Sequence, residues 1–584
     1  MQINSNLENR GCLFGMLRGV SLTFGRFVWI VGTAIFSLIV ANILYAVGEN
    51  KGSKAIEWCG SIVILGGAAI IVRWVWLWWL RPIVKGGAAL VKSTGLVKDN
   101  TFKDKPYAMS WRTAQGRYIN VGNPFRGIFV MGGAGSGKSE SVAVPALQMF
   151  AKMNFSGIVY DFKFPTLAQD VETFYEANRS PVRRFFIDLE QSSHSYRVNP
   201  LAPKYVRNSS YANEFAQAII DNLIPNQSDK SDFWTSSATA LLTACIWFLR
   251  KNKPEWCDLP HVCAMVTSSD ENLLRLLHTD TETANLTISV FNAMKRKADA
   301  QVAGVVSTLQ NAIAKINTPR LMWVFGADEV NLDINNPDNP VVLTIGSNPT
   351  LVKTFAPLVS LVATVCIKQM NAQGKAPSFV MLDEAPTIKI PNFSMLPATG
   401  RSNKIVTMYM CQDYSQMVNQ YGQQAADEIF ANLNNHFYGR VSSGKTAKLL
   451  SQQFGRIDES YVTSSMQNTS ILKQNLSESL RERDMIRSNE FTSLQVGEFA
   501  GLAVETNTPI WRAQLARVNR PTAAPIPYPI RHTESEIEEY YAQVRQDIDS
   551  MLGDAPTPNG RSSASPERAG RKDQGREQAD YIFE

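Results

Sequence analysis

The sequence is poor in cysteine and histidine, and neither residue type forms a recognisable pattern. Its 584 residues include seven cysteines and five histidines, without a CxxC pair or an HExxH motif. A sparse, odd set of cysteines excludes a disulfide framework and the common zinc motifs. We therefore expect no metal site made by these residue types, and we expect the bulk of the protein in a reducing compartment.

The chain also lacks a strong charge bias and internal repeats. The formal net charge is +6, which at this length permits contact with nucleic acid or anionic lipid but identifies no partner. The length exceeds that of one ordinary globular domain. Several structural parts are therefore expected.

Charged residues are missing from a long apolar segment near the N-terminus. Phe27–Gly48 contains none, and about 20 apolar residues suffice for a helix to cross a bilayer. A second run extends from Trp58 to Trp79, with Arg73 near its end, where a long side chain can reach the interface. The two runs predict a transmembrane hairpin. The alternatives are a buried hairpin of a soluble domain and a signal peptide, whose apolar region is shorter and nearer the start.

Basic residues flank this hairpin on its outer sides. Arg10, Arg18 and Arg26 precede the first run, and Arg81, Lys85, Lys92 and Lys98 follow the second. The short connection has balanced charge. Because positive residues favour the cytoplasmic side, both ends and everything after about residue 82 are expected in the cytoplasm.

A glycine-rich loop lies between a predicted strand, which ends at Met131, and a predicted helix. The loop and the start of the helix comprise Gly132, Gly133, Ala134, Gly135, Ser136, Gly137, Lys138 and Ser139. Glycines let backbone amides turn toward phosphates, and the helix N-terminus adds the positive end of its dipole. We expect Lys138 to contact the β and γ phosphates of ATP and the Ser139 hydroxyl to bind Mg²⁺.

Two adjacent carboxylates end a second predicted strand. Asp383 and Glu384 follow the apolar run that begins at Ser378. In open α/β sheets, ligand sites gather at the carboxyl ends of parallel strands. Asp383 is therefore predicted to bind the magnesium shell, and Glu384 to activate the attacking water.

A second segment, Gly439–Thr446, also fits the pattern GxxxxGK[ST]. It could form another nucleotide site. However, the strand before it is brief, its loop lacks internal glycines, and no second strand with a carboxylate pair follows. We interpret this segment as a strand-to-helix connection.

Further short motifs follow in a defined order. They are Asp161-Phe-Lys163, Asn199-Pro-Leu201, Phe233-Trp234, Gly400-Arg401 and Cys411-Gln412. Across residues 25–520 the series resembles the coupling-protein family of conjugative type IV secretion systems. The family often has Asp-Pro-Lys-Gly where this chain has Asp161-Phe-Lys163-Phe, which leaves the role of that loop open.

The resemblance implies roles for two more residues and a ring-shaped assembly. Arg401 resembles the arginine that reaches a neighbouring subunit's γ-phosphate, and Gln412 resembles a residue that senses the nucleotide state. The alternatives are a surface arginine and a structural amide. A homo-hexamer is the assembly that the resemblance implies.

The expected fold class is α/β: a RecA-like P-loop NTPase domain with an all-helical insertion, preceded by a two-helix transmembrane hairpin. The expected parts are the hairpin (1–82), the first NTPase segment (83–204), the helical insertion (205–335), the second NTPase segment (336–520) and a largely disordered tail (521–584). Helical spacing predicts insertion helices at Tyr211–Leu223, Trp234–Leu249, Asn272–His278 and Asn292–Ile316, and one tail helix at Glu534–Met551.

The resemblance implies an ATPase of the bacterial inner membrane that couples a relaxase–DNA complex to a type IV secretion channel and drives DNA, expected to be single-stranded, during conjugation. Two alternatives stay open. A chromosome-partitioning DNA translocase usually has more membrane spans, a long linker and a C-terminal winged-helix module. A substrate-recruitment platform would use ATP mainly for assembly.

Overall fold

The chain divides into two compact units, Met1–Gly95 and Leu96–Glu584. The structure, a computed structural model, describes residues 29–75, 105–224, 233–466, 474–506 and 509–553. Each unit is described by itself below.

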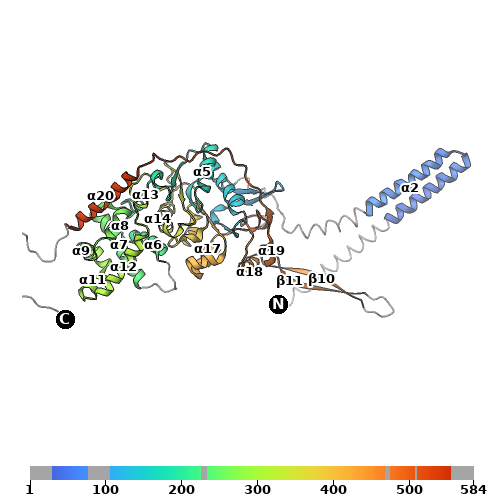
Figure 1. Cartoon of the computed structure of the whole chain (residues 1–584). Coiled ribbons are helices and arrows are strands. Elements are labelled where there is room, and N and C mark those ends of the chain that lie inside the picture. Colours follow the sequence, from blue (N-terminus) through green and yellow to red (C-terminus); the bar gives the residue numbers. More distant parts are fainter. Residues whose placement is uncertain (1–28, 76–104, 225–232, 467–473, 507–508, 554–584) are drawn as a thin grey trace, which may run out of the picture. The chain divides into compact units, whose positions relative to one another are not determined.

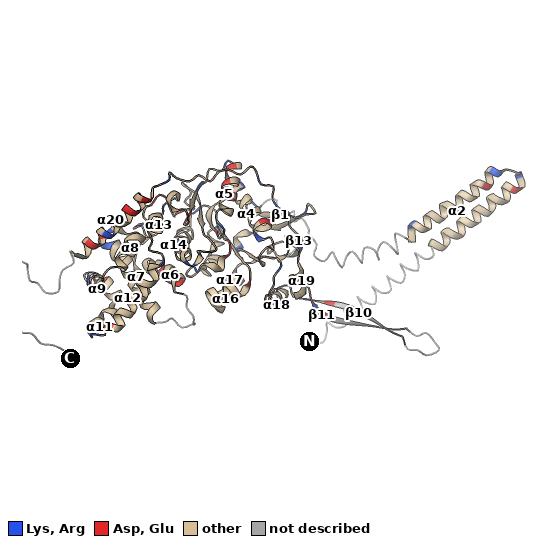
Figure 2. Cartoon of the chain, in the orientation of Figure 1, with Lys and Arg blue, Asp and Glu red and all other residues tan. Residues whose placement is uncertain are grey.

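The first unit contains two apolar helices, Trp29–Lys51 and α2 (Lys54–Val75). Both are long and apolar enough to cross a membrane, and little of either is buried. Figure 2 shows their charged residues only near the helix ends. The helices face each other through small and polar groups, with the Tyr45 hydroxyl 2.7 Å from the Ser61 hydroxyl. These helices fit the predicted hairpin; residues 76–82 lie outside the described part.

A nine-stranded sheet forms the centre of the second unit, in the order β13-β12-β9-β3-β8-β7-β4-β6-β5 (Figure 1). The strands from β9 to β5 in this order are parallel, whereas β12 and β13 form an antiparallel edge. Their bounds are β3 Ile128–Met131, β4 Ser156–Asp161, β5 Arg183–Ile187, β6 Val341–Gly346, β7 Ser378–Leu382, β8 Ile405–Cys411, β9 Asn435–Tyr438, β12 Glu498–Leu502 and β13 Ile510–Gln514. Continuous apolar runs suit the parallel strands because both faces are covered.

Two hydrophobic cores lie on the two faces of the sheet. On one face, α4 (Val144–Lys152) and α5 (Thr166–Ala177) pack together with the short hairpin of β1 (Met109–Arg112) and β2 (Tyr118–Val121). On the other face, α14 (Val352–Met370) joins the core shared with the helical region. By length and composition α14 could also cross a membrane, but 72% of its most apolar window is buried inside this unit. It is therefore a core helix.

The region between β5 and β6 is helical, as expected. Its main helices are α6 (Ser209–Leu223), α7 (Phe233–Asn252), α8 (Leu259–Val266), α9 (Asp270–Leu277), α10 (Thr281–Leu286), α11 (Ile288–Lys295), α12 (Asp299–Ala314) and α13 (Pro319–Val324). The stretch with helical spacing at Asn292–Ile316 is helical but not one continuous helix. Two helices meet there, because Lys297 adopts a left-handed backbone conformation (φ 56°) that ends α11.

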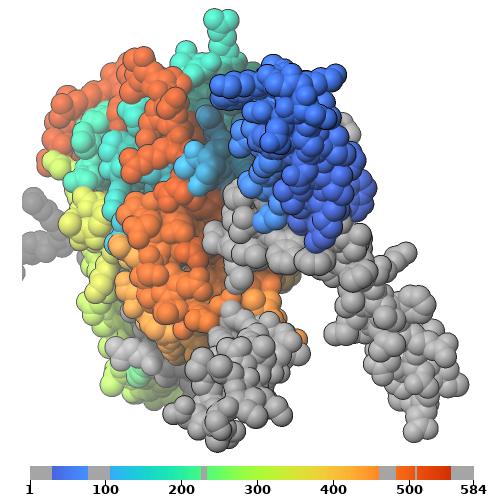
Figure 3. All heavy atoms as spheres, turned by 90° about the vertical axis from the view of Figure 1, so that its right-hand side faces the viewer, coloured from blue at the N-terminus to red at the C-terminus, as the bar shows by residue number. Residues whose placement is uncertain are grey.

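The structure describes the segment that follows β13 as far as residue 553, and this first part of the predicted tail is ordered. Arg520 bonds to Glu140 and Asp170, and the Ala524 amide donates to Thr173. The segment then runs along the surface (Figure 3) to α20 (Glu534–Gly553), which packs on α8 and α13 (Figure 1). Ile537, Val544 and Ile548 are buried, so apolar packing orders a segment whose composition suggested disorder. The predicted helix at Glu534–Met551 is confirmed; residues 554–584 lie outside the described part.

A long antiparallel ribbon leaves the unit after α18 (Gly444–Gln453). It consists of β10 (Arg456–Met466) and β11 (Gln474–Asp484), which pair with each other along their whole length. The chain then returns through α19 (Ser488–Ser493) to the antiparallel edge of the sheet.

Candidate functional site

The glycine-rich loop joins β3 to a helix, as the sequence predicts. The helix begins with a π turn over Ser139–Ala143 and continues as α4. Gly135 and Gly137 have φ values of 72° and 97°, which favour glycine. A Cβ on Gly137 would also lie 2.9 Å from the Gly497 nitrogen, so this position has no room for a side chain.

Polar groups converge inside this loop. The Lys138 ammonium donates a hydrogen bond to the Gly132 carbonyl oxygen at 2.6 Å. The Ser136 hydroxyl is buried and has no hydrogen-bond partner among the described residues. An unpaired buried hydroxyl costs free energy, and an oxygen-rich ligand such as a phosphate would satisfy it.

The two carboxylates stand at the end of β7, across the same cavity. The Asp383 amide donates to the Tyr160 carbonyl oxygen at 3.1 Å, which ties the strand end to β4. Burial and, to a smaller extent, neighbouring Glu384 raise the pKa of Asp383 to about 6, although Lys138 and Lys163 oppose the rise. The Asp383 carboxyl group therefore takes up a proton at higher pH than an ordinary aspartate does.

Glu384 combines backbone strain with an unsatisfied oxygen. Its φ and ψ of 54° and 51° place a non-glycine residue in the left-handed region. Its Oε1 is buried without a hydrogen-bond partner among the residues described. Strain and unpaired acceptors of this kind occur at sites where a ligand completes the structure.

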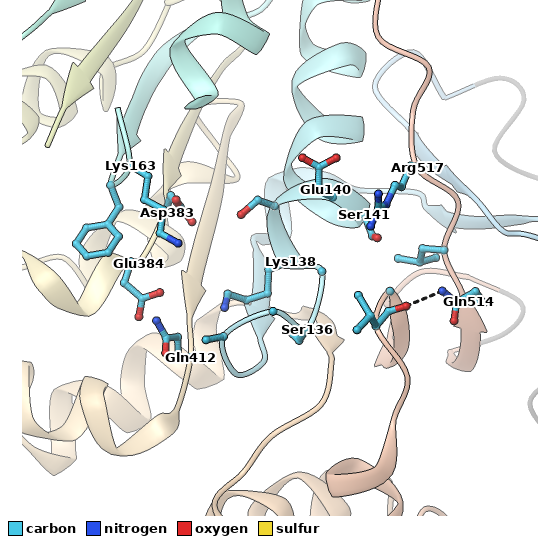
Figure 4. Close-up of a pocket in the computed structure, with 18 residues that line it drawn as sticks. Ser136, Lys138, Glu140, Ser141, Lys163, Asp383, Glu384, Gln412, Gln514 and Arg517 are labelled. Carbon is cyan, nitrogen blue, oxygen red and sulfur yellow. Dashed lines mark hydrogen bonds between the residues drawn. The ribbon is translucent and has the colours of Figure 1, made fainter. Parts of the chain in front are cut away.

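These groups line one cavity of about 530 Å³. Figure 4 shows Asp383, Glu384 and Gln412 on one side of Lys138. Gln412 follows β8, and its backbone amide donates to the Gln416 side chain at 3.2 Å. Of the predicted loop residues, Ala134 to Ser139 line the cavity, while Gly132 and Gly133 lie at the base of the loop.

Arg401 lies outside the cavity. It follows α15 (Met395–Gly400), precedes β8, and its side chain is 55% exposed. Its guanidinium is 3.7 Å from the Glu505 carboxylate, which also binds Arg126 at 2.5 Å and lies 3.8 Å from Lys105. The cluster stands at the amino ends of β3 and β8, whereas the cavity lies at their carboxyl ends.

In the segment Asp161–Lys163, the aspartate has a structural role and the lysine lines the cavity. The Asp161 carboxylate accepts bonds from the backbone amides of Lys163, Leu167 and Ala168, and so it anchors the start of α5. Burial raises the pKa of Asp161 to about 7. The Lys163 side chain lines the cavity opposite the glycine loop.

The second GxxxxGK[ST] segment connects β9 to α18, which confirms its interpretation as a strand-to-helix connection. The Gly133 amide donates to the Arg440 carbonyl oxygen at 2.7 Å, so this segment supports the first loop. Its Thr446 hydroxyl donates to the Asp413 carboxylate at 2.9 Å, which ties this segment to the chain that follows β8.

Sequence analysis missed one wall of the cavity. This wall is formed by residues next to β12 and β13, the antiparallel strands at one edge of the sheet. Its residues are Val496, Gly497, Gln514, Leu515 and Arg517. The Gly497 amide donates to the Ser136 carbonyl oxygen at 2.9 Å, which joins this wall directly to the glycine loop. The isolated glycine at position 497 was the available signal, because such glycines often mark a close backbone approach.

The donor set fits a magnesium nucleotide. The glycine loop, Lys138 and Glu384 line one cavity, and Ser136 and Glu384 each have a buried oxygen without a hydrogen-bond partner among the described residues. Among the described residues, no group of three or more His, Cys, Asp or Glu side chains could hold a metal by itself. Mg²⁺ commonly binds through one or two protein oxygens together with phosphate oxygens and water, and Asp383 and Ser139 could supply the protein oxygens here.

Comparison with known proteins agrees with this geometry. The profile described as "Type IV secretory system Conjugative DNA transfer" matches residues 85–516. No curated protein sequence matches the chain significantly.

Solved structures of the bacterial conjugative coupling protein TrwB share the fold. Its unbound form has a TM-score of 0.58 and 15% identity, covering 73% of this chain and 92% of TrwB. The complex with ADP and Mg²⁺ has a TM-score of 0.58 and 15% identity, covering 74% and 94%. The complex with a non-hydrolysable ATP analogue has a TM-score of 0.55 and 13% identity, covering 70% and 89%.

The family profile spans most of the chain and includes the glycine loop, the helical region and the carboxylate pair. The chain belongs to the type IV secretory system conjugative DNA transfer family.

Proposed function

We propose that the chain binds and hydrolyses ATP in this cavity and uses the reaction to drive DNA transfer. The observation that carries the proposal is that the glycine loop and the carboxylate pair, distant in sequence, line one cavity. The complex of TrwB with ADP and Mg²⁺ supports the choice of ligand.

The residues divide the chemistry between them. The loop amides and Lys138 bind and orient the phosphates, and the ammonium stabilises charge that develops during phosphoryl transfer. Glu384 would accept a proton from the attacking water; it lines the cavity, and its Oε1 has no hydrogen-bond partner among the described residues, which supports this role. Gln412, on the next strand, is positioned to respond to the γ-phosphate.

Ser139 and Asp383 would hold Mg²⁺. The ion would supply charge neutralisation between the β and γ phosphates. The raised pKa of Asp383 reflects a carboxylate that is buried beside another acid, and a cation there would favour its ionised form.

Arg401 is proposed to act on the nucleotide of a neighbouring subunit. It stands at the edge of the sheet opposite its own cavity, and it is half exposed. In a closed ring, the heterologous interface brings two different faces of the subunit together. A homo-hexameric ring, as the family resemblance implies, would place this edge against the next subunit's cavity.

The cellular setting completes the proposal. The family assignment supports DNA as cargo and the type IV secretion machinery as partner. A relaxase bound to this DNA is the finer proposal, which the family resemblance implies. The apolar hairpin and its flanking basic residues support anchoring in the bacterial inner membrane, with the second unit in the cytoplasm.

Phosphate release by the detergent-solubilised full chain tests the proposal. Wild-type protein should hydrolyse ATP in the presence of Mg²⁺, and Lys138→Ala should abolish turnover. Equal turnover by both proteins would refute the assigned site.

A further inference from the structure

The cavity extends past the glycine loop, on the side away from Glu384. Figure 4 shows Gln514 and Arg517 there, with Lys138 between them and the carboxylates. Given the proposed function, on which this inference rests, the γ-phosphate faces Glu384 and the β-phosphate lies in the loop. The nucleoside of the nucleotide must then extend toward the wall formed by Val496, Gly497, Gln514, Leu515 and Arg517.

Backbone hydrogen bonds hold this wall at a fixed distance from the phosphate loop. Gly497 donates to the Ser136 carbonyl oxygen, and Leu515 donates to the Gly497 carbonyl oxygen, each at 2.9 Å. In addition, the Gln514 side-chain amide Nε2 donates to the Val496 carbonyl oxygen at 2.8 Å. Such a preorganised wall can contact a ligand without an ordering cost.

Arg517 is an available cation on this wall. It is exposed, and among the described residues its guanidinium takes part in no hydrogen bond or ion pair. Arg520, three residues later, differs: it donates two hydrogen bonds to Glu140 and two to Asp170, at 2.6–3.1 Å. The two arginines of the same segment therefore have different surroundings.

Glu140 is the nearby acidic residue, but its carboxylate pairs with Arg520 and not with Arg517. The pKa of Glu140 is lowered mainly by its hydrogen bonds to Arg520, while Arg517 contributes only a weaker attraction through space. Because Arg520 already satisfies the Glu140 carboxylate, Arg517 is left to bind an acceptor in the cavity.

We propose that Arg517 binds the ribose and base of the nucleotide, with the half-exposed Val496 offering an apolar contact beside it. The guanidinium can donate to ribose oxygens and can lie against the face of a base. Arg517 thus contributes to affinity for the nucleoside, whereas the glycine loop contributes affinity for the phosphates.

Tripolyphosphate, which has the phosphate chain without a nucleoside, separates the two contributions. Calorimetric titration uses the detergent-solubilised full chain with Glu384→Gln, so that ATP stays intact, in the presence of Mg²⁺. Arg517→Ala should weaken ATP binding about tenfold, the loss expected for a charged hydrogen bond, and leave tripolyphosphate binding unchanged. Equal losses for both ligands, or no loss for either, would overturn the inference.

Arg520→Ala is the matched control on the same segment. Removing this guanidinium leaves the Glu140 carboxylate unpaired next to the phosphate loop, so both ligands should bind more weakly. If Arg520→Ala instead weakened only ATP, the wall would be sensitive to any disturbance and the assignment to Arg517 would be wrong.

Binding of the two ligands by the Glu384→Gln protein, without a change at Arg517 or Arg520, distinguishes failure of this inference from failure of the proposed function. ATP that binds no more tightly than tripolyphosphate would overturn the nucleoside contact but leave the phosphate site intact. Protein that binds neither ligand would overturn the proposed function itself.

Discussion

Arg401 precedes the strand β8 and Gln412 follows it, so the two residues lie at opposite ends of this strand. The strand spans Ile405–Cys411, a length of about 23 Å at about 3.3 Å per residue. An arginine side chain is much shorter than this distance. Arg401 therefore cannot reach the cavity that Gln412 lines, and its proposed contact with a nucleotide requires a second subunit.

Mixing two inactive variants tests this arrangement. Arg401→Ala keeps a complete nucleotide site, and Lys138→Ala keeps the arginine. In mixed rings, an Arg401→Ala site beside a Lys138→Ala subunit is complete, so a 1:1 mixture should recover up to about a quarter of wild-type turnover if subunits mix randomly around a ring. ATPase rates across mixing ratios provide the measurement. No recovery at any ratio, although cross-linking shows mixed oligomers, would count against action in trans.

Glu384→Gln separates binding from hydrolysis. The amide preserves shape but cannot accept the proton from water, so turnover should fall by about 10²–10⁴-fold. ATP should still bind, because the phosphates are held by the loop and Lys138. Equilibrium binding and single-turnover rates check both statements. Turnover close to wild type would remove Glu384 from its role as general base.

The raised pKa of Asp383 predicts a pH dependence of magnesium-nucleotide binding. The folded pKa of about 6 exceeds the ordinary value of 3.8, so protonation begins at higher pH than for a free carboxyl group. Since Mg²⁺ requires the carboxylate, affinity should fall up to about tenfold per pH unit below pH 6. Titrations from pH 5 to 8 test this, with Asp383→Asn as the control for the titration of ATP itself. An identical pH dependence in both proteins would contradict the assignment.

The packing of α20 predicts a stability effect far from the nucleotide. Ile548 is 1% exposed, so Ile548→Ala should lower the free energy of unfolding by about 2–4 kcal/mol. Glu538→Ala, on the exposed face of the same helix, should change it by less than about 0.5 kcal/mol. Chemical denaturation monitors both. Equal stability of the two variants would mean that α20 is not part of the folded unit.

The parts of the site that sequence reasoning found were local patterns. Glycines before a helix and a carboxylate pair after an apolar strand each reveal their chemistry within a few residues, and the sheet brings them together because parallel strands end at one edge. The apolar hairpin was visible for the same reason, since membrane-spanning length is a local property.

The parts that sequence reasoning missed depend on contacts between distant segments. Nothing near Arg517 shows that the strand before it, β13, pairs at the edge of the sheet and brings this segment to the glycine loop. The order of residues 521–553 depends on burial of Ile537 and Ile548 against a helical region some two hundred positions earlier. The break at Lys297 is a single backbone conformation inside a continuous helical pattern, which periodicity does not detect.

Turnover of ATP with and without single-stranded DNA tests the central claim most directly. The measurement uses the detergent-solubilised full chain and the Lys138→Ala variant, with oligomeric mass recorded on the same samples. A DNA-moving ATPase predicts turnover that rises on addition of single-stranded DNA and that is lost in the variant. An ATP turnover rate that does not change at any DNA concentration, or that persists in the Lys138→Ala variant, would contradict the account.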